Sequence, residues 1–259
     1  MALEGRIALV TGGGSGLGRA SALKLAAEGA DIALLSRTME EVDAVCLEIT
    51  RLGRKALPLY ADISDVADMQ AAFDQITETF GRLDIVFANA GINGTWAPLE
   101  ELTVEDWDKT NAVNLRGTFL TLHHAVPLMK EHGGSIIITS SINGTRTFTT
   151  AGASAYSTTK AGQLALTQMA ALELAKHRIR VNAICPGAIE SQIDQNTEQR
   201  NVEMAAEPAY YPDGDIPLTD GKPGKAEEIA DLVCFLSSDS SRHITGTPIW
   251  IDGAQSLLV

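Results

Sequence analysis

A tyrosine and a lysine four residues apart, Tyr156 and Lys160, are the residues of this 259-residue chain whose spacing most directly suggests chemistry. On a helix, that spacing puts both side chains on one face, one turn apart. A free tyrosine, with a pKa of about 10, is a poor base at neutral pH, but a nearby ammonium favours the phenolate and lowers that pKa. A phenol tuned in this way can give a proton to a carbonyl oxygen, or take one from an alcohol, as a hydride moves. A plain surface pair is the alternative interpretation.

A glycine-rich stretch, TGGGSGLGRA at 11–20, follows the apolar run RIALV at 6–10. The best-known dinucleotide fingerprint, G-x-G-x-x-G, does not fit it in any frame. The glycines follow T-G-x-x-x-G-x-G instead, with Gly12, Gly16 and Gly18 in the glycine positions. A strand, a glycine turn and a helix form a setting in which backbone N–H groups bind phosphate, although a loose turn has the same composition.

Short apolar runs alternate with helical patterns along the chain. Runs this apolar are expected to be buried on both faces, as in a parallel sheet. The alternation predicts an α/β fold: a single Rossmann-type, doubly wound domain over 1–259, with a seven-stranded, mainly parallel sheet and helices on both faces. Ligands then bind at the carboxyl ends of the strands. The predicted strands are 6–10, 32–36, 56–62, 83–90, 135–141, 179–186 and 247–253.

Two of the predicted helices carry specific signals. Thr38, with Glu41 three residues later, is a capping-box signature that opens a helix. Further along, five apolar residues spaced by 3, 4, 3 and 4 form one helical stripe, which Gly81 closes. The stripe consists of Val66, Met69, Phe73, Ile76 and Phe80.

From Thr11 to Gly253, the order of the motifs resembles that of the short-chain dehydrogenase/reductase family. The resemblance implies an oxidoreductase that transfers a hydride between a nicotinamide cofactor and a carbonyl or secondary-alcohol substrate. It divides the domain into a dinucleotide-binding part, about 1–135, and a catalytic and substrate part, about 136–259. The matching motifs are the glycine turn, Asp62, Asn89-Ala90-Gly91, Asn114, Ser141, the Tyr156–Lys160 pair and Pro186-Gly187.

The resemblance assigns a role to each residue of the reaction centre. Ser141 would hold the substrate oxygen against Tyr156, and Lys160 would bond the nicotinamide ribose and lower the pKa of the tyrosine. Ser140 is a competing candidate for the serine. The family's serine stands three residues before a glycine, here Gly144, which favours Ser141.

Two further matches complete the implied site. Asn114, in NAVNLRG, matches the asparagine that holds a water for proton relay to the lysine, and Asn111 is the weaker match. The loop that begins at Pro186-Gly187 resembles P-G-x-x-x-T, with Ser191 in place of the threonine. In the family this loop contacts the nicotinamide amide.

The residue that discriminates NAD from NADP is expected roughly 20 residues beyond the glycines. Ser36 stands there in place of an acid, and Arg37 follows it. The missing carboxylate removes repulsion toward a 2′-phosphate, which a guanidinium can bind. We therefore expect NADP(H) to be favoured; NAD(H), in an alcohol or sugar dehydrogenase with a solvated Arg37, is the alternative. The predicted cofactor-binding residues are Gly12, Gly14, Ser15, Gly16, Leu17, Gly18, Ser36, Arg37, Asp62, Ile63, Asn89, Ala90, Gly91, Tyr156, Lys160, Pro186, Gly187, Ile189 and Ser191.

The segment 192–222 has no clear periodicity, and family members use this region as a lid over the substrate. Tyr210 and Tyr211 could stack on a ring or sugar face, or only pack the lid. The stretches 92–96 and 145–150 should form other walls, and their hydroxyls, together with Arg146, favour a polar substrate. A sugar or polyol, a 3-oxoacyl thioester, a steroid and a small ketone all stay open, because specificity lies in the loops.

Composition limits the partners and the location. A net charge of −13 and a pI near 4.8 argue against nucleic acid and anionic membrane surfaces. Cys46, Cys185 and Cys234 lie far apart and form no C-x-x-C, so neither disulfides nor a metal site is expected. A reducing cytoplasm suits them, and there is neither a signal-peptide pattern nor an apolar run of about 20 residues.

Helices like those expected over about 103–132 and 155–177 pair across a two-fold axis in the family, which implies a homotetramer or homodimer. A competing function class is a non-catalytic dinucleotide sensor. Such proteins typically lose the tyrosine or the lysine, whereas this chain keeps both, together with the asparagine and the serine.

Overall fold

Seven parallel strands form the central sheet. The structure, a computed structural model, describes residues 1–191, 193–207, 211 and 214–258. The strand order is β3-β2-β1-β4-β6-β7-β9, and within these residues every neighbouring pair is parallel. The predicted doubly wound, seven-stranded sheet is therefore confirmed. Its strands are β1 (Ile7–Thr11), β2 (Asp31–Ser36), β3 (Ala56–Tyr60), β4 (Ile85–Ala88), β6 (Gly134–Thr139), β7 (Ile179–Pro186) and β9 (Pro248–Ile251).

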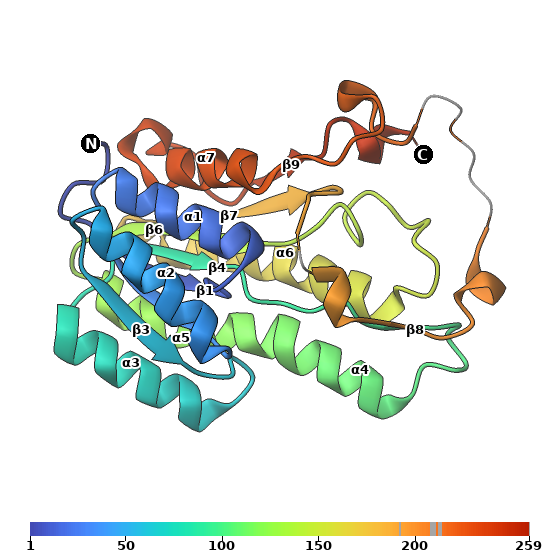
Figure 1. Cartoon of the computed structure of the whole chain (residues 1–259), viewed down its shortest axis with the longest axis horizontal. Helices are drawn as coiled ribbons and strands as arrows, with labels where there is room; N and C mark the ends of the chain where they lie inside the picture. Colours follow the sequence, from blue (N-terminus) through green and yellow to red (C-terminus); the bar gives the residue numbers. More distant parts are fainter. Residues whose placement is uncertain (192, 208–210, 212–213, 259) are drawn as a thin grey trace.

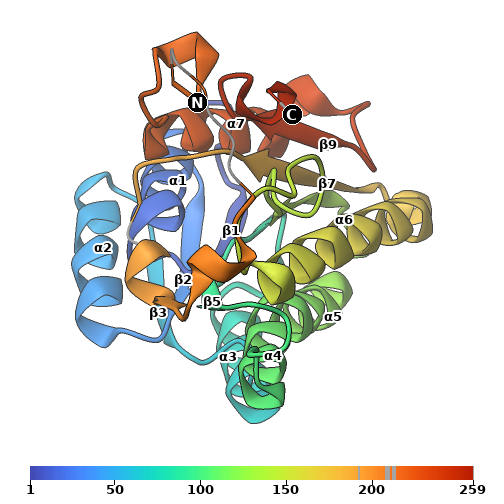
Figure 2. The same cartoon turned by 90° about the vertical axis from the view of Figure 1, so that its right-hand side faces the viewer.

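Helices cover both faces of this sheet (Figures 1 and 2). The helices α1, α2 and α7 pack on one face, while α3, α5 and α6 pack on the other. Within the described residues, no helix combines the length and apolar character that crossing a membrane requires. The helices are α1 (Gly16–Ala27), α2 (Met39–Arg51), α3 (Val66–Phe80), α4 (Val104–Asn111), α5 (Gly117–Met129), α6 (Ser154–Leu174) and α7 (Ala226–Ser237).

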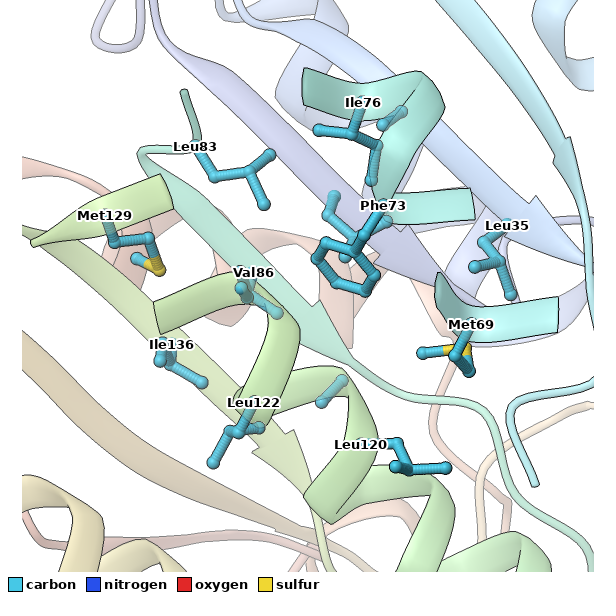
Figure 3. Close-up of a cluster of buried hydrophobic side chains, with 14 of the residues drawn as sticks. Leu35, Met69, Phe73, Ile76, Leu83, Val86, Leu120, Leu122, Met129 and Ile136 are labelled. Atoms are coloured by element: carbon cyan, nitrogen blue, oxygen red, sulfur yellow. The ribbon is translucent and has the colours of Figure 1, made fainter. Parts of the chain in front are cut away.

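Each face of the sheet has its own hydrophobic core. Under α3 and α5, one cluster brings together Phe73 of α3, Leu35 of β2, Val86 of β4 and Leu120 of α5 (Figure 3). Strand side chains alternate between the faces, and both faces are buried, so the strands are apolar without interruption. The two cores hold the sheet rigid, and with it the loops at the strand ends.

Helix α3 ends as the sequence predicts. Gly81 follows it with φ of 72°, the left-handed conformation that favours glycine at a helix C-terminus. At the other end, the Asp65 side chain accepts the N–H of Asp68 and caps the helix. The predicted stripe is buried at Met69, Phe73 and Ile76, whereas its first residue, Val66, is exposed.

The capping box predicted for α2 is wrong. Thr38 precedes the helix, but its side chain makes no capping hydrogen bond within the described chain. Glu41 lies instead against the glycine turn after β1, where a Cβ added to Gly14 would be 2.8 Å from Glu41 Oε2. Because Gly14 has no side chain, there is room beside the turn for this carboxylate.

The helical region predicted over 103–132 is interrupted at a functionally interesting place. It consists of α4, a π-helical turn η1 (Ala112–Arg116) and α5. Asn114 lies in the turn and is fully buried. Single π-helical turns are frequent at functional sites.

A small second sheet was not predicted. The strands β5 (Gly94–Trp96) and β8 (Thr197–Gln199) pair in parallel, and Asn93 Nδ2 donates to Thr197 Oγ1 at 2.7 Å. Strands of three residues are too short to show a period. This sheet fastens the start of the predicted lid to the wall at 92–96. Short 3₁₀ turns are η2 (Ala175–His177), η3 (Ile193–Asn196), η4 (Val202–Ala205), η5 (Pro217–Thr219), η6 (Asp239–Ser241) and η7 (Gln255–Leu257).

Candidate active site

A cleft of about 890 Å³ lies at the carboxyl ends of the strands, at the neighbours β1 and β4, between which the direction of the strand order reverses. This volume is within the usual range for ligand sites, and the position is the switch point of a doubly wound sheet. Most of the predicted site residues line it, whereas Gly14, Gly18 and Asn114 lie behind its surface. The predicted residues that line it are Gly12, Ser15, Gly16, Leu17, Ser36, Arg37, Asp62, Ile63, Asn89, Ala90, Gly91, Ser141, Tyr156, Lys160, Pro186, Gly187, Ile189 and Ser191.

The turn between β1 and α1 requires its glycines. Gly12 and Gly16 have φ of 64° and 49°, in the left-handed region. A Cβ added to Gly18 would lie 2.0 Å from the Gly12 carbonyl oxygen, so helix and turn approach each other more closely than any side chain allows. The N-terminus of α1 therefore faces the cleft across a turn whose glycines have no side chains. This arrangement fits the pyrophosphate of a dinucleotide.

Hydrogen bonds hold the ends of β1, β4 and β6 together. The Thr11 hydroxyl accepts the N–H groups of Asn89 and Ala90, at 3.0 and 3.1 Å. Asn89 Nδ2 donates to the Thr11 carbonyl at 3.2 Å, and Asn89 Oδ1 accepts from the Thr139 hydroxyl at 3.2 Å. The asparagine therefore fixes the cleft floor through three strands.

Asp62, at the end of β3, is held as an oriented carboxylate. Its Oδ1 accepts from the Ser64 N–H and hydroxyl at 2.8 and 2.7 Å, and Arg37 Nη1 lies 3.7 Å from Oδ2. Burial, the largest single influence, acts to raise the pKa of Asp62, but the Ser64 hydrogen bonds and the arginines Arg37 and Arg116 together lower it. An oriented carboxylate acceptor is therefore present at this edge of the cleft at neutral pH.

Tyr156 and Lys160 lie on one face of α6, as their spacing predicts, and both are buried, at 7% and 3% exposure. Lys160 Nζ donates to the Thr139 carbonyl at 2.9 Å and lies 5.4 Å from the centre of the tyrosine ring. The Ser141 hydroxyl lies near that of Tyr156 and acts to lower the pKa of the tyrosine. Three functional groups thus meet at the cleft surface: a phenol, a hydroxyl and an ammonium.

The two candidate serines differ in what their hydroxyls do. Ser140 donates to the Lys160 main-chain carbonyl at 2.8 Å and thereby fastens β6 to α6. Ser141 accepts the N–H of Asn143 at 3.1 Å and reaches Tyr156. The geometry favours Ser141 as the serine that faces a substrate.

Asn114 supports the site from behind. Its Oδ1 accepts the Ile92 N–H at 2.8 Å, and its Nδ2 donates to the Ile92 carbonyl and to Thr159 Oγ1. Asn111 is half-buried, and its side chain donates within its own helix, to the Trp107 carbonyl. The π-helical turn therefore aims Asn114, and not its neighbour, at the backbone beside Gly91.

The loop after β7 contacts the end of the chain. The Ala188 N–H donates to Gln255 Oε1 at 2.8 Å, and Gln255 Nε2 donates to Asp215 at 3.1 Å. A Cβ on Gly187 would be 2.7 Å from the Cβ of Asp252, so only glycine fits there. Gln255 therefore links this loop to the segment predicted as a lid.

The remaining wall of the cleft combines amides, hydroxyls and aromatic rings. Tyr211 lines it and donates to the Leu258 carbonyl at 2.7 Å, while Tyr210 lies outside the described residues. Arg146 does not line the cleft; it stacks 3.5 Å above the Trp250 ring. The polar groups on this wall come from Asn93, Asn143, Thr147, Thr149 and Thr150, and Trp96 lies beside them.

Several residues of the site escaped the sequence analysis. Thr139, the last residue of β6, holds Asn89 through its hydroxyl and Lys160 through its main-chain carbonyl. Its position two residues before Ser141 is the one signal in the sequence that could have indicated it. Glu41 was interpreted as a helix cap although it lines the cleft. Gln255 has no motif of its own.

Comparison with known proteins identifies the family. Residues 12–254 match a sequence profile described as enoyl-(acyl carrier protein) reductase. Levodione reductase of Leifsonia aquatica is 40% identical over 97% of this chain and 94% of its own length. A crystal structure of a 3-ketoacyl-ACP reductase from Sinorhizobium meliloti 1021 is 56% identical, with a TM-score of 0.95 over 98% of this chain and all of that one.

The chain belongs to the short-chain dehydrogenase/reductase family. It is an oxidoreductase of the kind that acts on carbonyl and alcohol groups. Related structures hold either form of the cofactor. One from Brucella melitensis contains NADH (31% identical, TM-score 0.85, 98% of this chain and 99% of that one). One from Burkholderia cenocepacia contains NADP (35% identical, TM-score 0.86, 98% and 99%).

In this short-chain dehydrogenase/reductase, burial is the main influence on the pKa values of Tyr156 and Lys160. Burial raises the pKa of Tyr156 to about 12, and the nearby Ser141 hydroxyl offsets only part of the shift. Burial also lowers the pKa of Lys160 to about 8. Both charged forms are desolvated, and the ammonium is directed at the Thr139 carbonyl. The lowering of the tyrosine pKa by Lys160 stays a prediction. At neutral pH the phenol keeps its proton and the lysine its charge.

A pH profile tests these two values. Proton donation needs the phenol, which persists to about pH 12, and the charge of Lys160, which is lost as the pH rises through about 8. We expect kcat/KM for carbonyl reduction to be level near neutrality and to fall above about pH 8 by about tenfold per pH unit. The measurement is initial rates at saturating cofactor.

Lys160→Arg is the control, because a guanidinium keeps its charge over this range. Its descending limb near pH 8 should be absent, whatever its maximal rate. A wild-type profile that stayed level to about pH 10 would contradict a depressed lysine pKa.

Proposed function

We propose that this protein is a carbonyl reductase, reversible as a secondary-alcohol dehydrogenase, that prefers NADP(H). The observation that carries the proposal is the meeting of Ser141, Tyr156 and Lys160 in the same cleft as the glycine turn. A non-catalytic dinucleotide sensor has no use for a buried phenol beside a buried ammonium. Burying both groups disfavours their charged forms, and such perturbed pairs cluster at functional sites.

The geometry supports an acid-catalysed reduction. Ser141 and Tyr156 both present hydroxyls that can donate to a carbonyl oxygen. As negative charge develops on that oxygen, the phenol gives it a proton. Lys160, 5.4 Å from the ring centre, stabilises the phenolate that remains. When bound beside these groups, a nicotinamide dinucleotide would supply the hydride.

The hydrogen bonds of Asn114 suit a role in returning a proton from solvent to Lys160. Both protons of its amide are used, by Ile92 and Thr159, whereas Oδ1 accepts only the Ile92 N–H. An amide oxygen has two lone pairs, so one acceptor site is left for a water. Gly91 lies between this oxygen and Lys160: a Cβ there would be 3.1 Å from Oδ1 and 3.6 Å from Nζ. A relay from solvent to the lysine is therefore compatible with this arrangement.

Tyr156→Phe tests the proton donor. Removing the phenolic hydroxyl leaves the ring in place, so NADPH binding should change by less than about twofold. The rate of carbonyl reduction should fall by about 10²–10⁴-fold, the usual size of general acid catalysis. The measurement is turnover of a ketone panel, followed by NADPH absorbance.

Tyr60→Phe is the matched control, since it removes a tyrosine hydroxyl from an exposed position on β3. Its turnover should equal that of the wild type. Undiminished turnover in Tyr156→Phe would refute the assignment.

The cleft wall supports a ketone that carries further oxygen atoms. Asn93 and Asn143 offer amides and Thr150 a hydroxyl, while Trp96 and Tyr211 offer flat faces for a ring or chain. The names of the relatives, a levodione reductase and a 3-ketoacyl-ACP reductase, agree on a ketone and differ in its size. We propose a small polar ketone as the substrate class.

Arg37 supports the preference for NADP(H). Its side chain is 59% exposed at the cleft edge and paired only loosely with Asp62, at 3.7 Å. A guanidinium in that position can form a planar, two-pronged contact with a 2′-phosphate. Ser36 beside it carries no charge that would repel the phosphate.

Titration of the protein with NADPH and with NADH, followed by cofactor fluorescence, tests the preference. NADPH should bind the wild type more tightly. Arg37→Ser should weaken NADPH by about tenfold, which is about 1.4 kcal/mol, and change NADH little. Arg51→Ser, at an exposed arginine at the end of α2, should change neither. Tighter binding of NADH to the wild type would reverse the proposed preference.

We also propose a homodimer or homotetramer in the cytoplasm. Helices α5 and α6 expose large apolar side chains: Phe119 is 50%, Met169 71% and Leu172 82% exposed. Apolar residues gathered on one side of a soluble protein mark an interaction surface. The three cysteines are free and buried, which suits a reducing compartment.

The mass in solution tests the assembly. Light scattering should give two or four times the chain mass of 27.5 kDa. Leu172→Asp should shift the population toward smaller species, because it places a charge in the proposed interface. Leu47→Asp, on exposed α2 across the sheet, should not. A monomeric wild type would exclude the proposal.

A further inference from the structure

Glu41 lies in the cleft at the place where NAD and NADP are distinguished. It is half-buried and lines the cleft together with Ser36 and Arg37. A Cβ added to Gly14 would be 2.8 Å from Glu41 Oε2 and 3.5 Å from Ser36 Oγ. The carboxylate, the serine hydroxyl and the glycine turn therefore meet around one point.

Within the described residues, no hydrogen bond or ion pair engages the Glu41 side chain. It does not take part in a capping box, although its sequence position suits one. Glu40, its neighbour in the first turn of α2, is exposed to solvent and does not line the cleft. Both carboxylates interact favourably with the positive N-terminal end of the helix dipole. The dipole therefore does not explain why Glu41, and not Glu40, points into the cleft.

A carboxylate at this edge has a specific use in dinucleotide recognition. In doubly wound folds, an acid at the end of the second strand accepts a hydrogen bond from the ribose 2′-hydroxyl, whereas an arginine accommodates a 2′-phosphate. The end of β2 holds Ser36 here, so the usual acid is missing. Glu41 brings a carboxylate to the same edge from the first turn of the next helix.

We propose that Glu41 accepts the 2′-hydroxyl of NAD(H) and opposes the 2′-phosphate of NADP(H). The inference rests on the proposed function. Arg37 and Glu41 then act in opposite directions on the same ribose position, and their balance sets the ratio of the two affinities. Glu41 thus limits the preference that Arg37 creates, and the protein binds both cofactors.

Glu41→Gln separates the two effects, because the amide is nearly the same size as the carboxylate and carries no charge. In titrations followed by cofactor fluorescence, NADPH should bind the variant about tenfold more tightly than the wild type. NADH should bind at least about threefold more weakly, since an amide oxygen is a poorer acceptor than a carboxylate. The ratio of dissociation constants, and not turnover, is the readout.

Glu40→Gln is the matched control: it removes the same charge from the same helix turn but from a side chain outside the cleft. It should leave both dissociation constants within about twofold of the wild type. An equal shift in the two variants would show a general charge effect and overturn the assignment of Glu41. So would an unchanged ratio in Glu41→Gln. Glu41→Ala, made in parallel, must move the ratio in the same direction, which guards against poor folding of one variant.

Titration of the wild type distinguishes a failure of this inference from a failure of the proposed function on which it rests. A wild type that binds neither NADPH nor NADH would overturn the proposed function, and the inference with it. A wild type that binds a cofactor, with a ratio insensitive to Glu41, would overturn only the role of Glu41.

Discussion

Everything in the cleft depends on a few hydrogen bonds that hold the carboxyl ends of three strands in register. Thr11 and Asn89 join the end of β1 to the end of β4, and Thr139 joins β6 to Asn89. The same Thr139 residue accepts Lys160 on its carbonyl. The support of the phosphate-binding turn and the support of the catalytic lysine are therefore one connected network. Asn89 contacts both Thr11 and Thr139 and is therefore common to the two supports.

The sequence predicts the parts of this structure that depend on side-chain type. Apolar runs bounded by helical patterns determine the seven strands, and the left-handed backbone at Gly12 and Gly16 accepts little except glycine. The four-residue spacing places Tyr156 and Lys160 on one face because helix geometry leaves no other choice. These features depend on residues close together in the sequence, so a sequence pattern can predict them.

The parts that sequence reasoning misses depend on what lies nearby in space. Lys160 is held by a main-chain carbonyl, which every residue type possesses, so no motif marks it. Glu41 turns toward the cleft because Gly14, far from it in sequence, leaves room. The strand at Gly94–Trp96 exists because a segment about a hundred residues later lies beside it. Burial also depends on residues that are distant in sequence. The residues beside Tyr156 in the chain do not indicate that burial disfavours its phenolate.

The strand order has a consequence for how the chain is made. Along the sequence, β2 pairs with β1, β3 with β2, β4 with β1, β6 with β4, β7 with β6 and β9 with β7. Each strand of this sheet after β1 therefore finds one neighbour already synthesised when it leaves the ribosome. Vectorial synthesis favours such an order, because unpaired strand edges invite aggregation. The cleft itself is closed last, when β9 and Gln255 emerge and reach the loop that follows β7.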